Sequence, residues 1–325
     1  MNILIFGGTG FVGINIASAL LARRHTVTLL DRGALPRAAG QAFASFGGAL
    51  EVVEGDITDS QALEATVARG FDAIILGAAI TAGPAREAAD PPSILHVNLM
   101  AQVPILMAAH RQGVRRIINL SSGSAYGAAA FRHPLLDEEL ACEPVSLYAI
   151  TKFASERVAA RLADLWQAEF ISVRLSGVFG PWERLTGARD TPSPQMQIVA
   201  ALRQKKAAVL PRPGVRDWIY APDVADAITV LVEAPKPKHG LYNISTGNEW
   251  TALQWGQHLA DLNPGFTCRL ARTDEAPTVD LHSDADRAPL SIARMTEEFG
   301  WRARFGCADS AADLNEWLIR HGEGM

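Results

Sequence analysis

Short apolar runs and amphipathic stretches follow one another in strict rotation from residue 2 to residue 174. The apolar runs are rich in Ile, Val and Leu with little alternation, which is typical of strands covered on both faces. They span 2–6, 26–30, 50–54, 73–76, 116–120 and 170–174, and the helix-like stretches include 13–24, 60–68, 94–112 and 148–167. Strands and helices in rotation predict an α/β fold with a doubly wound parallel sheet.

Three glycines, at positions 7, 10 and 13, follow the first strand and open the first predicted helix. Gly7 permits a tight turn, Gly10 lets a phosphate approach the backbone, and Gly13 allows close packing of helix on strand. The free N–H groups at the helix N-terminus favour an anion there. This strand–glycine–helix arrangement predicts a Rossmann-type dinucleotide site.

Asp31 ends the second predicted strand, about 20 residues beyond Gly13, where an acid binds the adenosine ribose hydroxyls. A carboxylate at this place repels a 2′-phosphate, so Asp31 favours NAD over NADP. Arg32 leaves NADP as the alternative, because an arginine beside that ribose can serve the 2′-phosphate. A plain turn residue at the end of a strand is the other interpretation of Asp31.

The overall composition argues against several classes of function. The 325 residues are 48% hydrophobic and 20% charged, as in ordinary globular proteins. A net charge of −5 and a pI of about 5.9 give no electrostatic case for nucleic acid or an anionic membrane. No apolar run reaches the roughly 20 residues of a membrane span, and the start of the chain shows no secretory pattern. Three cysteines and the histidines lack metal-ligand spacing, so we expect a cytoplasmic protein with free thiols and no metal.

Tyr148 and Lys152 lie four positions apart at the start of a predicted helix, hence on one face of it. They follow a serine-rich segment, 119–127, which ends a strand at the carboxyl edge of the sheet, where ligands bind in such folds. The pKa of tyrosine is ordinarily about 10, but a neighbouring ammonium and an oxidised nicotinamide would lower it and make the phenol a proton shuttle. The alternative is a surface pair without function.

Taken together, several segments resemble the extended short-chain dehydrogenase/reductases, and more narrowly their NAD-dependent sugar epimerase/dehydratase branch. The resemblance covers nearly the whole chain in order and spacing. Its segments are 7–13, Asp31, 55–57, 121–127, Tyr148 with Lys152, 174–181 and 216–220. It implies a Ser–Tyr–Lys active site in which Ser122 supplies the catalytic hydroxyl, Tyr148 is the acid and base, and Lys152 binds the nicotinamide ribose and tunes Tyr148.

The resemblance also implies which residues bind the cofactor and the substrate. For NAD these are Gly7, Thr9, Gly10, Phe11, Val12, Gly13, Asp31, Arg32, Asp56, Ile57, Ala78, Ala79, Asn98, Tyr148, Lys152 and Val178. For the substrate they are Ser122, Ser124, Gly177 and Arg216, the arginine meeting a nucleotide-sugar diphosphate. Arg184, Arg189 and Arg287 are further candidates, because arginine binds phosphate or carboxylate with two hydrogen bonds. Alternatively, Arg184 and Arg189 belong to a solvated loop.

Three positions depart from the family pattern. Gly77 stands where many relatives carry histidine. Gly177 replaces the substrate-contacting Asn of nucleotide-sugar enzymes, which weakens the case for a nucleotide sugar but not for oxidoreduction. Ser124 stands where dehydratases carry an acid, so dehydration is disfavoured.

After Arg174 the rotation weakens. A loop spans 180–194, helices are predicted over 195–205, 223–232, 253–262 and 308–321, and strand-like segments lie near Val209 and at 241–244. We expect an NAD-binding Rossmann domain over 1–180 and a smaller α/β substrate-binding domain over 181–325. Segments near 218–248 should return to the Rossmann core.

Three functions remain open on the sequence alone. The first is epimerisation of a sugar or nucleotide sugar: Tyr148 removes a hydroxyl proton while hydride passes to NAD⁺, and the hydride returns to the other face of the keto intermediate. The second is net dehydrogenation of a smaller sugar or sugar acid with release of NADH. The third is a non-catalytic NAD-binding scaffold, against which the intact Ser122, Tyr148 and Lys152 argue.

Members of the resembling family commonly dimerise through a four-helix bundle. In this chain the bundle would use 94–112 and 148–167, which carry apolar residues beyond one stripe. We therefore expect a homodimer; a monomer that buries these faces internally is the alternative.

Overall fold

The protein is described by a computed structural model, which places residues 1–321. Its centre is a seven-stranded parallel sheet in the order β11-β6-β5-β4-β1-β2-β3. The strands are β1 (Asn2–Phe6), β2 (Thr26–Asp31), β3 (Leu50–Glu54), β4 (Ala73–Leu76), β5 (Arg116–Ser122), β6 (Glu169–Leu175) and β11 (Leu241–Ile244). The predicted α/β class and the predicted strands of this sheet are confirmed.

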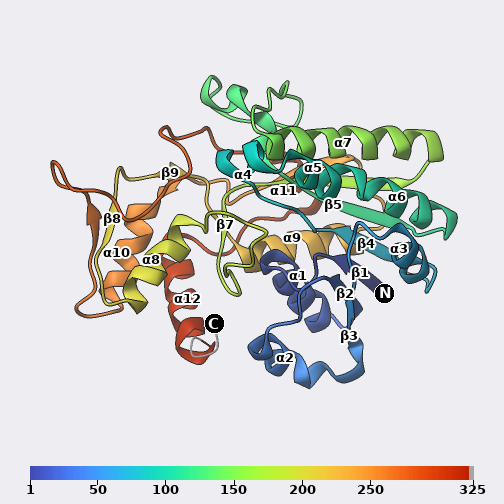
Figure 1. Ribbon diagram of the computed structural model, residues 1–325, viewed down its shortest axis with the longest axis horizontal. Helices are drawn as coiled ribbons and strands as arrows, with labels where there is room; N and C mark the ends of the chain where they lie inside the picture. The colour runs from blue at the N-terminus through green and yellow to red at the C-terminus, as the bar shows by residue number, and fades with distance from the viewer. Residues whose placement is uncertain (322–325) are drawn as a thin grey trace.

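Helices cover both faces of the sheet (Figure 1). One face carries α1 (Phe11–Ala22) and α9 (Ala221–Glu233); the other carries α3 (Ser60–Val67), α6 (Gln102–Arg111) and α7 (Leu147–Trp166). Side chains alternate along β1, so that Ile3 and Ile5 join one hydrophobic cluster while Leu4 and Phe6 join the other. Burial of both faces explains why the strands read as continuous apolar runs.

The direction of winding reverses at β1. From β1 the chain continues outward to β2 and β3, and then returns to the other side of β1 with β4, where Gly77 N–H donates to the Phe6 carbonyl at 2.9 Å. Open α/β sheets bind ligands in the crevice outside the carboxyl ends of their strands at such a reversal. The loops after β1, β4 and β5 therefore frame the expected site.

The second half of the chain forms a smaller group of elements on one side of the sheet (Figure 1). It contains α8 (Pro194–Arg203), β8 (Ala208–Leu210), β9 (Val215–Arg216), β12 (Trp250–Thr251), α10 (Ala252–Asp261), β13 (Cys268–Leu270) and α12 (Cys307–His321), whereas α11 (Ala293–Phe299) packs against β11 of the main sheet. Two short strands, β7 (Val178–Phe179) and β10 (Ile219–Tyr220), pair with each other, and β11 pairs with β6 in the main sheet. The pairing of β11 agrees with a return to the core near 218–248, and the division of the chain at residue 180 stays our proposal.

The helix expected over 94–112 is divided. It consists of α5 (Pro91–Leu95), a π-helical turn over His96–Met100 and α6. The whole run, Pro91–Arg111, is long and apolar enough to cross a membrane by length and composition alone, and 44% of its most apolar window is buried inside the protein. Core helices of soluble proteins pass the same test. Short helices α2 (Arg37–Phe43), α4 (Pro84–Ala89) and α11 were not predicted.

Candidate active site

The glycine loop leaves no room for side chains at two of its three predicted positions. Gly7 has a φ of 75°, and a Cβ on it would lie 2.6 Å from the Ala78 nitrogen. A Cβ on Gly13 would lie 2.5 Å from the Gly7 carbonyl oxygen. Gly10 is the N-cap of α1 and makes no side-chain cap, so the first N–H groups of the helix are free for a ligand. The loop is built as a phosphate cradle.

Asp31 lies beside this loop at the end of β2. Its carboxylate accepts hydrogen bonds from the N–H groups of Thr9 (3.2 Å) and Gly33 (3.3 Å). Arg32 pairs with Asp56 at 3.7 Å, and both side chains are exposed. Ile57 is buried behind them. The residues predicted to surround the adenosine are thus brought together, at the carboxyl ends of β2 and β3.

A cavity of about 980 Å³ extends from the glycine loop to the second half of the chain. Most of the predicted site residues line it. They are Gly7, Gly10, Phe11, Val12, Gly13, Ala79, Ser122, Ser124, Tyr148, Lys152, Gly177, Val178, Arg189, Arg216 and Arg287. The cavity therefore joins the predicted cofactor, catalytic and substrate residues in one space.

Tyr148 and Lys152 face this cavity from the first turns of α7. The helix begins where the Ser146 hydroxyl accepts the Ala149 N–H at 3.1 Å. Burial raises the pKa of Tyr148, while hydrogen bonding with Ser122 and Thr81 and the charge of Arg189 act in the opposite direction. The Ser122 hydroxyl itself is held by the Ser124 N–H at 3.2 Å.

Lys152 is held beneath the tyrosine. Its Nζ donates to the Leu120 carbonyl oxygen at 2.7 Å and lies 5.9 Å from the centroid of the Tyr148 ring. The side chain is almost completely buried, which lowers its pKa to about 8, against an opposing effect of Glu156. A positive charge at this place favours the ionised phenol of Tyr148.

A buried ion pair supports the helix one turn further along. Arg174 on β6 and Glu156 on α7 are joined at 2.7 Å, and the Ser121 hydroxyl also donates to Glu156. Burial makes such a pair a poor source of stability by itself. Its geometry instead fixes the separation of α7 from β5 and β6, and with it the distance between Tyr148 and Ser122.

Gly177 and Trp218 fit each other at the substrate side of the cavity. A Cβ on Gly177 would lie 2.4 Å from the Trp218 ring, so an asparagine does not fit here as the ring is placed. The guanidinium of Arg216 stacks over the same ring, with its carbon 4.8 Å from the ring centroid. Burial and the charge of Arg287 lower the pKa of Arg216 to about 9. Its charge has no salt-bridge partner within residues 1–321, which suits an anionic ligand.

The two other arginines of the cavity are held by buried acids. Arg287 pairs with Asp217 at 3.0 Å and donates to the Ser176 hydroxyl at 2.7 Å. Arg189 pairs with Glu183 at 3.0 Å, and burial raises the pKa of Glu183. Arg189 is therefore not the free side chain of a solvated loop.

Asn98, Ala78 and Arg184 are predicted site residues that are not among those lining the cavity. Asn98 is buried in the π-helical turn, where its amide binds both the N–H (2.7 Å) and the carbonyl (3.0 Å) of Ile80 and the Thr151 hydroxyl (3.2 Å). Ala78 packs on Gly7. Arg184 contacts the glycine loop through the Thr9 carbonyl at 2.7 Å, away from the other three arginines. Their roles toward NAD and substrate stay predictions.

The sequence reasoning missed several residues that line the cavity. Thr81 and Glu87 lie on the segment after β4, and Glu87 accepts the Tyr148 N–H at 3.2 Å. His282 comes from the second half of the chain, and burial lowers its pKa. The only available signal for Thr81 and Glu87 was topological: β4 neighbours both β1 and β5, so the segment following it must approach the same edge.

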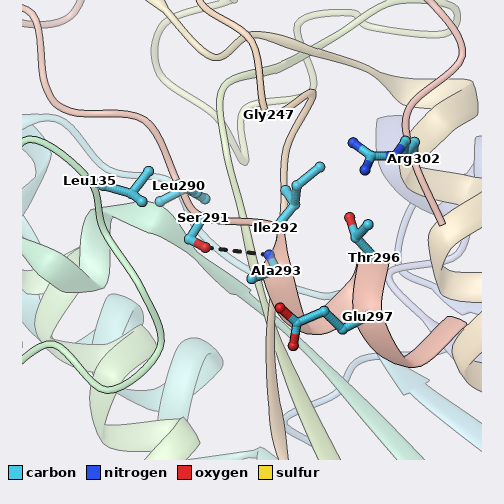
Figure 2. A pocket seen from close by; sticks show the side chains of 9 residues that line it. All are labelled: Leu135, Gly247, Leu290, Ser291, Ile292, Ala293, Thr296, Glu297 and Arg302. Carbon is cyan, nitrogen blue, oxygen red and sulfur yellow. Dashed lines mark hydrogen bonds between the residues drawn. The ribbon is translucent and has the colours of Figure 1, made fainter. Parts of the chain in front are cut away.

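A smaller hollow of about 300 Å³ lies between Leu135 and segments of the second half of the chain (Figure 2). Its walls are Leu135, Gly247, Leu290, Ser291, Ile292, Ala293, Thr296, Glu297 and Arg302. It contains none of the predicted site residues. Within residues 1–321, no group of three His, Cys, Asp or Glu side chains is placed to hold a metal ion.

Comparison with known proteins identifies the family to which this chain belongs. The model of the NAD dependent epimerase/dehydratase family matches residues 3–245. The chain belongs to this family. It is 27% identical over 330 residues to the UDP-glucose 4-epimerase of Mycolicibacterium smegmatis, with 98% of each chain covered. The predicted family, its NAD dependence and the prediction of an enzyme of the epimerase/dehydratase type are confirmed.

The NAD dependent epimerase/dehydratase family also accounts for the fold. One similar structure is UDP-N-acetylglucosamine 4-epimerase from Methanobrevibacter ruminantium M1 in complex with UDP-N-acetylmuramic acid, with a TM-score of 0.82, 21% identity and 98% of each chain covered. Another is UDP-glucuronic acid 4-epimerase from Bacillus cereus in complex with NAD, with a TM-score of 0.79, 17% identity, and 98% of this chain and 99% of that chain covered.

The residues present fit NAD. The cradle at Gly7, Gly10 and Gly13 matches a pyrophosphate, because side chains are sterically excluded at Gly7 and Gly13 and the α1 N-terminus lies open. Asp31 stands at the ribose end, and the hydroxyl of Ser122 and the buried ammonium of Lys152 stand at the nicotinamide end. The cavity between them connects the two ends.

Proposed function

We propose that the protein is an epimerase of a nucleotide sugar and inverts one ring carbon, C4 in its relatives' names, by transient oxidation. The observation that carries this is the placement of Tyr148, Ser122 and Lys152 in one cavity with the glycine loop and with Arg216. A pure NAD-binding scaffold has no need of a phenol positioned over a buried ammonium. The full-length similarity to a UDP-glucose 4-epimerase supports the same substrate class.

Bound NAD supplies a hydride acceptor that can return the same hydride. The Tyr148 phenolate removes the proton of the substrate hydroxyl, and the resulting phenol gives it back on the return step. The ammonium of Lys152, anchored on the Leu120 carbonyl, favours the ionised phenol. The Ser122 hydroxyl donates a hydrogen bond to the substrate oxygen while the charge on that oxygen changes during the reaction.

The polar groups of the cavity favour epimerisation over dehydration. Ser124 lines the cavity, and its hydroxyl is buried without a hydrogen-bond partner within residues 1–321. A buried hydroxyl of this kind suits a substrate hydroxyl or carbonyl. Removal of water from a sugar requires an acid or a base, and a serine hydroxyl is neither at neutral pH.

The substrate's anionic part is assigned to the end of the cavity at Arg216 and Arg287. Arg216 has the unpaired charge, while Asp217 holds Arg287 in place. Two guanidinium groups around one point suit the diphosphate of a nucleotide sugar. Arg189 lies nearer to Tyr148, since its backbone pairs with that of Thr81, and is assigned to the sugar.

The absence of a side chain at Gly177 favours one alternative function, net dehydrogenation. With no side chain at that position, the cavity lacks an amide contact to a nucleotide sugar, and a net dehydrogenase of a smaller sugar or sugar acid fits the remaining space. The two functions differ in their products. Incubation with NAD⁺ and a panel of nucleotide sugars, aldonic acids and uronic acids should give epimer without net NADH; stoichiometric NADH with any of them would replace the epimerase by a dehydrogenase.

A homodimer in the cytoplasm completes the proposal. Apolar side chains are exposed on the helices expected to pair, with Met100 and Leu165 each 57% exposed and Met107 44% exposed. Two copies facing each other across α6 and α7 would cover them. Sedimentation equilibrium should give twice the mass of 34.9 kDa. A monomer at micromolar concentration would contradict the dimer.

A further inference from the structure

The guanidinium of Arg184 lies on the glycine loop, although the two are 175 positions apart in the chain. Nη2 donates to the Thr9 carbonyl oxygen at 2.7 Å. Nη1 is buried and has no hydrogen-bond partner in the described residues 1–321. A buried guanidinium nitrogen without an acceptor is unfavourable, so this arrangement suits an acceptor that a ligand provides.

The charge of Arg184 is also not neutralised by an ion pair. Asp31 is the nearby carboxylate that stabilises its charged form, yet no salt bridge joins the two within the part of the chain described. The Asp31 oxygens instead accept the N–H groups of Thr9 and Gly33. Arg184 therefore adds a positive charge to a loop that otherwise offers only backbone N–H groups.

The backbone before Arg184 is held in an unusual conformation. Trp182 has a φ of 67°, a left-handed value that a bulky residue rarely adopts, and its ring is buried edge-on against Trp317 with centroids 4.9 Å apart. Immediately after it, Glu183 turns inward to hold Arg189, while Arg184 reaches the glycine loop. One loop thus contacts the glycine loop and, through Arg189, the part of the cavity near Tyr148.

We propose that Arg184 is a pyrophosphate-binding residue, whose Nη1 donates to the NAD pyrophosphate where it crosses the glycine loop. The proposal rests on the proposed function only in that the protein binds NAD. A guanidinium fork suits two phosphate oxygens, and the open N-terminus of α1 favours the same anion. Because Arg184 and Arg189 share a loop, NAD binding also fixes the arginine assigned to the sugar.

The test compares Arg184→Gln and Arg184→Lys with Arg86→Gln. Arg86 donates to the Gly187 carbonyl at 2.6 Å, so its loss loosens the same loop without removing a donor from the glycine loop. Dissociation constants for NAD⁺, ADP-ribose and adenosine are measured by calorimetric titration on protein freed of copurified dinucleotide. Arg184→Gln should weaken NAD⁺ and ADP-ribose roughly ten- to hundred-fold and leave adenosine unchanged. Arg184→Lys should fall between, and Arg86→Gln should bind like the wild type.

Three results would overturn the role of Arg184. The first is an unchanged affinity of Arg184→Gln for ADP-ribose. The second is a loss of adenosine binding in Arg184→Gln as large as its loss of ADP-ribose binding, and the third is a loss of ADP-ribose binding in Arg86→Gln as large as that in Arg184→Gln. Either of the last two results would indicate that Arg184 is a purely structural residue. Failure of the wild-type protein to bind NAD⁺ would instead contradict the proposed function itself. Binding and turnover in the wild type with no effect of Arg184→Gln would contradict only the assignment of Arg184.

Discussion

Lys152 donates to the Leu120 carbonyl at 2.7 Å while its ammonium group lies 5.9 Å from the centre of the Tyr148 ring. The lysine therefore ties the carboxyl end of β5 to the start of α7. Because Ser122 ends the same strand, one contact sets the relative positions of all three predicted catalytic side chains. This relationship excludes the interpretation of Tyr148 and Lys152 as a surface pair.

Replacing Tyr148 by Phe tests its role as acid and base. The substitution removes only the hydroxyl, so turnover should fall by about 10²- to 10⁴-fold, the usual contribution of a positioned proton-transfer group. NAD⁺ affinity should change little, because the glycine loop and Asp31 remain. Activity and a binding titration on the same preparation measure both effects. A variant that retains near wild-type activity would refute the role.

Replacing Lys152 by Met should stabilise the fold at neutral pH. Burial holds the Lys152 pKa near 8, below the ordinary 10.5, so the folded protein carries an unfavourable charge below pH 8. Between about pH 8 and 10.5 the unfolded chain binds more protons than the folded one, so wild-type stability rises with pH across that window. The variant should gain on the order of 1–2 kcal/mol at pH 7, and this advantage should shrink toward pH 10.5.

Urea denaturation at pH 7 and pH 10 measures the difference in free energy of unfolding between the Lys152→Met variant and the wild type. Loss of the hydrogen bond to Leu120 offsets part of the gain, so the variant gains less than the free energy that corresponds to the full pKa shift. A variant less stable than the wild type at pH 7, or a difference independent of pH, would show that the ammonium is not the unfavourable group that its burial implies.

Replacing Arg189 by Met should shift the pH dependence of the rate. The charge of Arg189 lowers the Tyr148 pKa, so its removal raises that pKa and moves the rise in rate to higher pH. The single substitution leaves Glu183 buried without its partner. The double variant with Glu183→Gln therefore serves as the control for stability. A profile that keeps its midpoint in both variants would contradict an effect of Arg189 on Tyr148.

Replacing Gly177 by Asn tests whether Trp218 excludes a side chain there. The new Cβ meets the indole ring, and overpacking of this kind destabilises a fold by about 1–3 kcal/mol. Thermal unfolding should show the loss, with NAD⁺ affinity unchanged. Adding Trp218→Phe, which removes the indole atoms closest to the new Cβ, should restore part of the lost stability. A single variant as stable as the wild type would show that the ring moves freely.

Periodicity and the order of motifs were sufficient for the sheet, the glycine loop and the pairing of Tyr148 with Lys152. Those features depend on local spacing and on burial of both faces, which a sequence displays directly. The position of Arg184 depends instead on the left-handed backbone at Trp182, and nothing in the residue types around it signals that turn. Asn98 is buried within a π-helical turn, a deviation that a helical period does not reveal.

The segment after β4 could not be assigned for a different reason. Thr81 and Glu87 reach the active site only because β4 neighbours both β1 and β5, and because the Thr81 backbone pairs with Arg189. Strand order is a property of the assembled sheet. The sequence indicates where the strands are but not which strands pair with each other, so contacts that depend on strand order appear only in the structure.

The fate of deuterium during turnover shows whether the hydride taken from the sugar returns to it. UDP-glucose carrying deuterium at C4 is incubated with the protein and less than one equivalent of NAD⁺, and the product is examined by mass spectrometry and NMR. A hydride that returns to the same carbon gives the C4 epimer with the deuterium retained at C4 and no accumulation of NADH. Oxidised sugar with stoichiometric deuterated NADH, or epimer that has exchanged its label with solvent, would contradict epimerisation by a returned hydride.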